Sequence, residues 1–297
     1  MWRRAGRFDS KRRSASISTP GKLGNELGNQ LGNEFGHLHR IELPGRGLMP
    51  DDTDSGLRGG RFPITRLSAI VAAGSQDQVE RSRAFELLVA AYWMPVYKYI
   101  RIKWGKSSED AKDLTQGFFV AALEKNFFQR YDPARARFRT FLRTCLDGFV
   151  SNEEKAARRI KRGGNALILS LDFDSAEDQL ALMEPPAPNA IDEYFEAEWV
   201  RSILGMAVES LKSELLAGGK EIYFRLFNRY VLENPDSPPS YKDLAGEFDV
   251  SVSNVTNYLA AARREFRRIV LEKLRELTAT DEEFRREARA LLGVDPQ

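Results

Sequence analysis

The chain has 297 residues, of which 42% are hydrophobic, and a formal net charge of only +2, so it is long enough for about two domains. A single cysteine, Cys145, excludes an intrachain disulfide, and the absence of a long apolar run argues against a membrane span. The only histidines, His37 and His39, lie in a low-complexity segment, which excludes histidine-dependent catalysis and histidine-ligated metals elsewhere. We therefore expect no metal, no cofactor and no enzyme activity, although carboxylate catalysis stays open.

Residues 1–60 are predicted to be a disordered tail. A basic run is followed by three units of the type LGNE or LGNQ between residues 23 and 34, and glycine and asparagine at every fourth position oppose a helix. The first residues, MWRRAGRF, lack the apolar centre of a signal peptide. A cytoplasmic protein is therefore expected.

Residues 61–163 are predicted to form a first helical domain. Phe85, Leu88 and Tyr92 share one stripe, which we expect Pro95 to interrupt. A further helix begins after a serine cap near residue 107, and another runs from about 138 to 159 into a basic cluster at 155–162.

Residues 164–190 contain LDFDSAEDQ and EPPAPN, and this acidic, proline-rich composition predicts a flexible linker. A second helical domain is predicted over 191–279, with one helix from 191 and another at 223–232. A capping box at Thr280 and Glu283 predicts a last helix within 280–297. No segment alternates long enough to predict a sheet, so the expected fold class is all-α.

The most informative segment is SYKDLAGEFDVSVSNVTNYLAAARREFRR, residues 240–268. Ser240 with Asp243 predicts a capping box, and Asp249 stands where a left-handed residue is needed between two helices. Ser251 caps the second helix, whose inner stripe begins at Val255. This pattern favours a helix-turn-helix over a solvated helical hairpin.

The second helix of this segment presents short polar groups on its outer face and a basic far end, as a recognition helix does. The candidates for contact with base edges and phosphates are Ser253, Asn254, Thr256, Asn257, Tyr258, Arg263 and Arg264. Arg267 and Arg268 follow, and arginines at this end suit phosphates.

Three motifs together resemble the two-domain RNA polymerase sigma factors of the extracytoplasmic-function type. EDAKDLTQGFFVAALEK (109–125) is similar to the family's polymerase-binding helix, and RYDPARARFRTFL (130–142) to the segment that handles the melted promoter. SYKDLAGEFDVSVSNVTNYLAAARREF (240–266) is similar to the module that reads the upstream promoter element. The resemblance covers about residues 62–277.

The resemblance implies a region 2-like and a region 4-like domain that join core RNA polymerase to promoter DNA and promote strand opening. The implied partners are a coiled coil of the largest polymerase subunit, the flap of the second-largest subunit, and an inhibitory anti-sigma protein. The polymerase-binding residues would be Asp110, Asp113 and Gln116. The residues for melted DNA would be Tyr131, Arg135, Arg137, Arg139, Asn152, Arg158 and Arg159.

The chain also departs from the family pattern. Asp249 replaces the usual corner glycine, and Thr256, Asn257 and Tyr258 stand where basic residues are common, which leaves the preferred DNA sequence open. Two other interpretations stay open. One is a helix-turn-helix regulator with an N-terminal effector or dimerisation domain, and the other is an enzyme with a DNA-binding tail.

Overall fold

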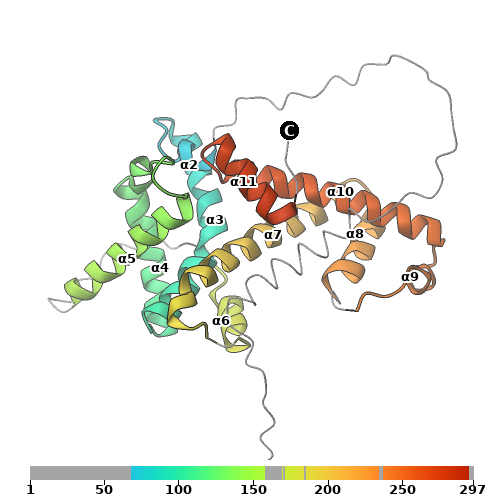
Figure 1. Ribbon diagram of the computed structural model, residues 1–297, viewed down its shortest axis with the longest axis horizontal. Helices are drawn as coiled ribbons and strands as arrows, with labels where there is room; N and C mark the ends of the chain where they lie inside the picture. The colour runs from blue at the N-terminus through green and yellow to red at the C-terminus, as the bar shows by residue number, and fades with distance from the viewer. Residues whose placement is uncertain (1–67, 158–168, 170, 184, 234–236, 294–297) are drawn as a thin grey trace, which may run out of the picture.

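The computed structural model describes residues 68–157, 169, 171–183, 185–233 and 237–293, and this part of the chain is all-α with no β-strand (Figure 1). The predicted tail at 1–60 lies outside the described residues. No helix within these ranges combines the length and the apolar character needed to cross a bilayer. The helices are α2 (Ala69–Ala72), α3 (Gln78–Lys103), α4 (Ser108–Glu124), η2 (Phe127–Arg130), α5 (Phe138–Ala157), α6 (Phe173–Ala181), η3 (Pro188–Ala190), α7 (Ile191–Ala217), α8 (Glu221–Phe227), η4 (Asn228–Leu232), α9 (Tyr241–Glu247), α10 (Val252–Glu276) and α11 (Asp281–Leu292).

The long helix α3 passes through Pro95 without ending, so the predicted interruption is wrong. Proline inside a helix removes one hydrogen bond, which costs about 3 kcal/mol. Here Pro95 is buried, and its neighbours Tyr92 and Val96 are almost fully buried too. Packing on both sides of the proline therefore offsets the local cost of the missing bond.

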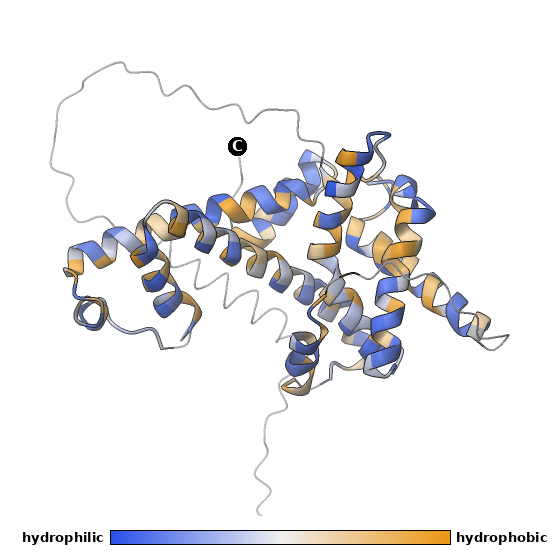
Figure 2. Cartoon of the chain, turned by 180° about the vertical axis from the view of Figure 1, so that it is seen from behind, coloured by the Kyte–Doolittle hydropathy of each residue, from blue (hydrophilic) through white to orange (hydrophobic). Residues whose placement is uncertain are grey.

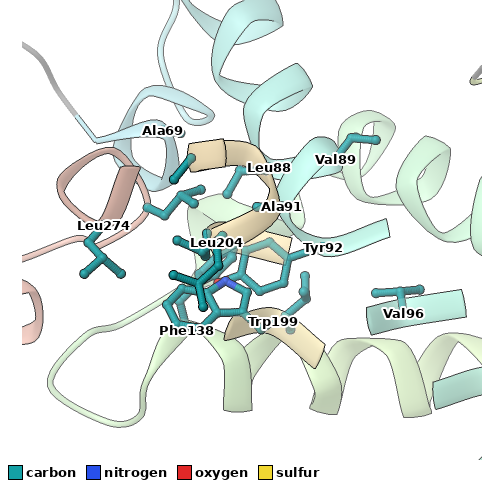
Figure 3. Close-up of a cluster of buried hydrophobic side chains, with 14 of the residues drawn as sticks. Ala69, Leu88, Val89, Ala91, Tyr92, Val96, Phe138, Trp199, Leu204 and Leu274 are labelled. Carbon is teal, nitrogen blue, oxygen red and sulfur yellow. The ribbon is translucent and has the colours of Figure 1, made fainter. Parts of the chain in front are cut away.

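One hydrophobic core joins the two groups of helices that the sequence analysis assigned to separate domains. α7 packs along α3, and the ring of Tyr92 stacks on Trp199 with centroids 6.3 Å apart (Figure 3). Phe138, at the start of α5, packs edge-on against Tyr92 in the same core. The expected separation into two domains on a flexible linker is therefore not observed in the described residues.

A buried ion pair fastens the same two helices. Lys98 Nζ of α3 lies 2.6 Å from Glu198 Oε2 of α7, and both side chains are almost completely buried. Lys98 also donates to the amide oxygen of Gln179 in α6, and Arg201 pairs with the other oxygen of Glu198. Burial and the nearby Arg201 guanidinium lower the pKa of Lys98 to about 8.

Part of the predicted linker is a helix that packs against α3. Asp172 caps α6, and Phe173 packs its ring 5.0 Å from the ring of Tyr97. Glu177 accepts hydrogen bonds from the Tyr97 hydroxyl and from Arg101 Nε, each at 2.6 Å. One acidic residue of the predicted linker, Glu177, is therefore the ion-pair partner of Arg101.

Part of the C-terminal region extends away from the α3–α7 contact. α7 and α10 lie side by side, and α8, α9 and the first turns of α10 form the far end of the molecule (Figure 1). The helix predicted at 223–232 is α8 followed by a π-helical turn, η4. Figure 2 shows hydrophobic residues along the inner sides of these helices and hydrophilic residues on their outer sides.

Candidate nucleic-acid interface

The corner between α9 and α10 has the local geometry that the sequence predicted. Ser240 Oγ accepts from the backbone N–H of Asp243 at 3.2 Å, and the Asp243 carboxylate accepts from the Ser240 N–H at 3.2 Å, which confirms the capping box. Asp249 has φ 50° in the left-handed region. Ser251 Oγ then accepts from the Asn254 N–H at 3.1 Å and begins α10.

A small hydrophobic cluster holds α8, α9 and the start of α10 together. Its fully buried members are Leu226, Leu244, Val255 and Leu259, as the predicted inner stripe requires. Tyr258 lies at the edge of this cluster, with its ring stacked on Tyr223 at 4.3 Å between centroids. The first turns of α10 are thus fixed by a core of their own.

The outer face of these turns is open. Ser253, Thr256 and Asn257 are exposed, whereas Asn254 and Tyr258 are half-buried. The Thr256 hydroxyl donates to the Val252 carbonyl at 3.1 Å, so its proton is used within α10. The structure therefore brings the three most accessible candidates together on one helical face.

The arginines of α10 differ in the contacts that their side chains make. Arg264 is exposed, and Arg263 lies over the ring of Tyr230 at 5.0 Å. Arg268 pairs with carboxylates on both sides along α10 and with Glu214 of α7. Burial disfavours its charge, but the hydrogen bonds that Arg268 donates to Glu272 and Glu265 outweigh burial and raise the pKa of Arg268. Arg268 thus links α10 to α7, whereas Arg264 is exposed.

The acidic face of α4 is also accessible. Ser107 caps this helix and donates its hydroxyl to the Asp110 carboxylate at 2.8 Å. Asp110 and Asp113 are exposed and Gln116 is half-buried. The opposite side of α4 is buried in the main core, so these three residues form a polar edge that points away from it.

Arg139 is not available to DNA, which corrects its assignment to the melted promoter. Its side chain is only 6% exposed and lies over the ring of Trp199 at 3.9 Å. Nε lies 2.5 Å from a Glu196 oxygen, and Nη2 lies 3.1 Å from a Glu287 oxygen. Burial opposes its charge, but the carboxylates of Glu196 and Glu287 outweigh burial and raise the pKa of Arg139.

The loop before Arg139 keeps part of the predicted surface. Arg135 and Arg137 are exposed, with Arg135 3.5 Å from Asp132. Tyr131 is half-buried between Phe138 and Phe141, and its hydroxyl donates to the Ala136 carbonyl at 3.1 Å. Burial raises the pKa of Tyr131 to about 12, and the nearby Glu283 carboxylate adds to this effect.

Asn152 is exposed in the C-terminal half of α5. Arg158 and Arg159 lie outside the described residues, as does most of the predicted basic cluster at 155–162.

The contacts that Phe138 and Arg139 make with distant residues were not predicted from the sequence. Trp199 and Glu196 come from α7, and Glu283 and Glu287 come from α11. Thr280 caps α11 as expected, but the Glu283 carboxylate accepts from the Ala279 N–H at 2.9 Å rather than completing the predicted box. The only local signal was the spacing of four between Glu283 and Glu287, which puts both carboxylates on one helix face.

Comparisons with protein-family models, with curated proteins and with solved structures found no significant match. Three surfaces of the described residues are therefore the candidates for function, and each carries one of the motifs: the outer face of α10, the acidic edge of α4 and the loop at 131–137.

Proposed function

We propose that this protein is a sigma factor of the extracytoplasmic-function type, which joins core RNA polymerase to promoter DNA and promotes strand opening. It acts without chemistry of its own, in the cytoplasm, where the polymerase works. The observation that carries the proposal is the tight corner between α9 and α10 with Ser253, Thr256 and Asn257 exposed beside it. In this interpretation α9 and α10 are a helix-turn-helix.

The start of α10 has the shape and chemistry for reading a major groove. An α-helix fits the groove, and an asparagine side chain pairs with adenine through two hydrogen bonds. Asn257 is exposed for such a contact, and the Thr256 methyl group suits the methyl of thymine. Arg264 lies about two turns further along α10 and would meet a phosphate.

The acidic edge of α4 is the proposed polymerase contact. Asp110 and Asp113 are exposed on the motif that resembles the family's polymerase-binding helix. Asp110 also interacts with its own cap, Ser107, and its charge suits the positive helix end. Asp113 is therefore the residue whose exposed charge has no such local role, and it is the better one to test.

Strand opening would use the loop at 131–137 and not Arg139. Exposed Arg135 and Arg137 suit a single-stranded backbone, and Tyr131 is the half-buried aromatic ring beside them. Arg139 orients the start of α5 from inside the core.

The test is co-purification of the protein with core RNA polymerase, followed by transcription from a selected promoter. Asp113→Arg should keep the fold and bind core at least about tenfold more weakly, because it places like charges together. Glu86→Arg is the matched control, since it reverses an exposed acidic residue on α3 and should leave binding unchanged. Wild-type protein that binds specific DNA but not the polymerase would favour the alternative regulator instead.

A further inference from the structure

The last helix, α11, lies against the segment proposed to receive melted DNA. It packs along the end of α10, and its inner carboxylates reach the start of α5. Glu283 Oε1 is 3.4 Å from the Phe138 backbone nitrogen, and Glu287 accepts from Arg139 Nη2 at 3.1 and 3.2 Å. Glu287 also lies 3.8 Å from Arg137. We call Glu283 and Glu287 the α11 carboxylate pair.

The α11 carboxylate pair occupies the positions that a nucleic-acid phosphate would take. Guanidinium groups and backbone N–H groups are the usual partners of phosphate oxygens. Here Arg137, Arg139 and the Phe138 N–H all face carboxylates of α11. The pair therefore neutralises the basic groups on the inner side of the loop.

Apolar contacts and ion pairs together hold α11 in this place. Ala288 and Leu292 are its buried hydrophobic residues, and Phe284 and Leu291 are half-buried against the main core. The outer face is charged and exposed, and it carries Asp281, Glu282, Arg285, Arg286 and Arg289. Release of α11 exposes the four apolar side chains and breaks the contacts of Glu283 and Glu287, so it requires a ligand whose binding offsets that cost.

We propose that α11 is an autoinhibitory latch, which pairs with the inner basic groups of the single-strand-binding loop through the α11 carboxylate pair and is displaced when nucleic acid binds there. This inference rests on the proposed function, because it assigns this loop to melted DNA. The latch competes with phosphate for Arg137 and for the Phe138 N–H. Arg139 stays paired with Glu196 when α11 leaves.

The first test uses the full chain and a labelled single-stranded DNA oligonucleotide, with affinity measured by fluorescence anisotropy at fixed salt. The variant Glu283→Gln/Glu287→Gln keeps side-chain volume and removes both charges. It should bind about tenfold more tightly, the factor expected when one charge-assisted hydrogen bond becomes available to a phosphate.

Two matched controls carry Glu282→Gln alone, and Glu282→Gln with Asp281→Asn. Asp281 and Glu282 are exposed on the same helix and do not face the loop. The second control removes two negative charges, as the variant does. Both controls should stay within about twofold of wild type, because exposed charges are screened by salt. Equal tightening by the variant and the double control would overturn the latch.

The second test needs no substitution and covers the case in which the variant fails to fold. Amide hydrogen exchange is measured on wild-type protein with and without a saturating amount of the oligonucleotide. Exchange in 281–292 should become faster when DNA binds, while exchange in α9 should not. Bound DNA with unchanged or slower exchange in 281–292 would overturn the proposal.

These measurements separate the latch from the proposed function. Tighter binding by the variant together with wild-type protein that never joins the polymerase would retain the latch and reject the sigma factor. Polymerase-dependent transcription with no difference between the variant and the double control would retain the sigma factor and reject the latch.

Discussion

The two regions proposed to contact DNA differ in how far their sequence pattern predicts their structure. At the start of α10, three of the residues that the pattern placed outside, Ser253, Thr256 and Asn257, are exposed, whereas Asn254 and Tyr258 are half-buried. The residues that it placed inside, Val255 and Leu259, are buried. In the segment 131–139, the same reasoning predicted a row of accessible arginines, yet Arg139 is buried. The same kind of reasoning therefore meets an exposed polar face in one region and a core ion pair in the other.

The difference comes from the sequence distance of the partners. Ser240, Asp249 and Ser251 shape their corner through bonds to residues within a few positions, so one short segment contains all the information. Arg139 meets Glu196 at a separation of 57 residues and Glu287 at a separation of 148. Only the packing of α7 and α11 on α5 brings these carboxylates to the arginine.

The largest expected effect tests the buried side of this comparison. Arg139→Ala leaves the buried Glu287 carboxylate, and the half-buried Glu196, without their cation, so the free energy of unfolding should fall by about 3–5 kcal/mol. Urea unfolding followed by circular dichroism measures this. Arg135→Ala, on the exposed loop, should change it by less than about 0.5 kcal/mol. Similar small effects for both arginines would mean that Arg139 is not a core residue.

Asn257→Ala tests the exposed side. It should cost about 1–3 kcal/mol of binding to a selected upstream element and little on random DNA, because only base edges carry sequence information. Competition binding at fixed salt gives both values. A loss that is the same on the two DNAs would remove Asn257 from base recognition.

Arg264→Ala should give a smaller and different result. A phosphate contact carries no sequence information, so affinity should fall about equally for specific and random DNA. The slope of log affinity against log salt should decrease by about one. An unchanged slope would show that this arginine does not reach the backbone.

Asp249→Gly tests the corner between the two helices. A non-glycine residue at φ 50° pays a steric cost of about 1–2 kcal/mol, and glycine removes it but loses more chain entropy. The protein should therefore gain up to about 1 kcal/mol of stability, whereas Asp249→Val should lose about that much or more. Thermal unfolding of both variants measures the difference, and stabilisation by valine would contradict the left-handed corner.

The last effect is a pH dependence at the contact between α3 and α6, the helix that replaced part of the predicted linker. Burial, and the hydrogen bond to Glu177, raise the pKa of Tyr97 to about 12. The unfolded chain loses this proton near its ordinary pKa of about 10, while the folded chain keeps it. The contribution is therefore complete below about pH 10 and is lost as the pH rises to about 12. Tyr97→Phe should show a shallower fall in Tm over this range, and an equal fall would exclude Tyr97 as the cause.

The sequence by itself determined the features that short-range physics controls. The all-α class, the serine caps at 107, 240 and 251, the left-handed Asp249 and the inner stripe of α10 all follow from patterns within about one or two helical turns. Such features need no distant partner, because they depend on local hydrogen bonds and on one small hydrophobic cluster.

Only the tertiary structure decided which helices share a core and which charges are buried. The continuation of α3 through Pro95, the folding of α6 onto Tyr97 and Arg101, and the burial of Arg139 each depend on surfaces supplied from far along the chain. The sequence shows only that these groups are charged or helix-breaking. The free-energy cost of burying the charges, and of placing proline inside α3, is offset by the packing and the ion pairs that form when α3, α5, α7 and α11 meet.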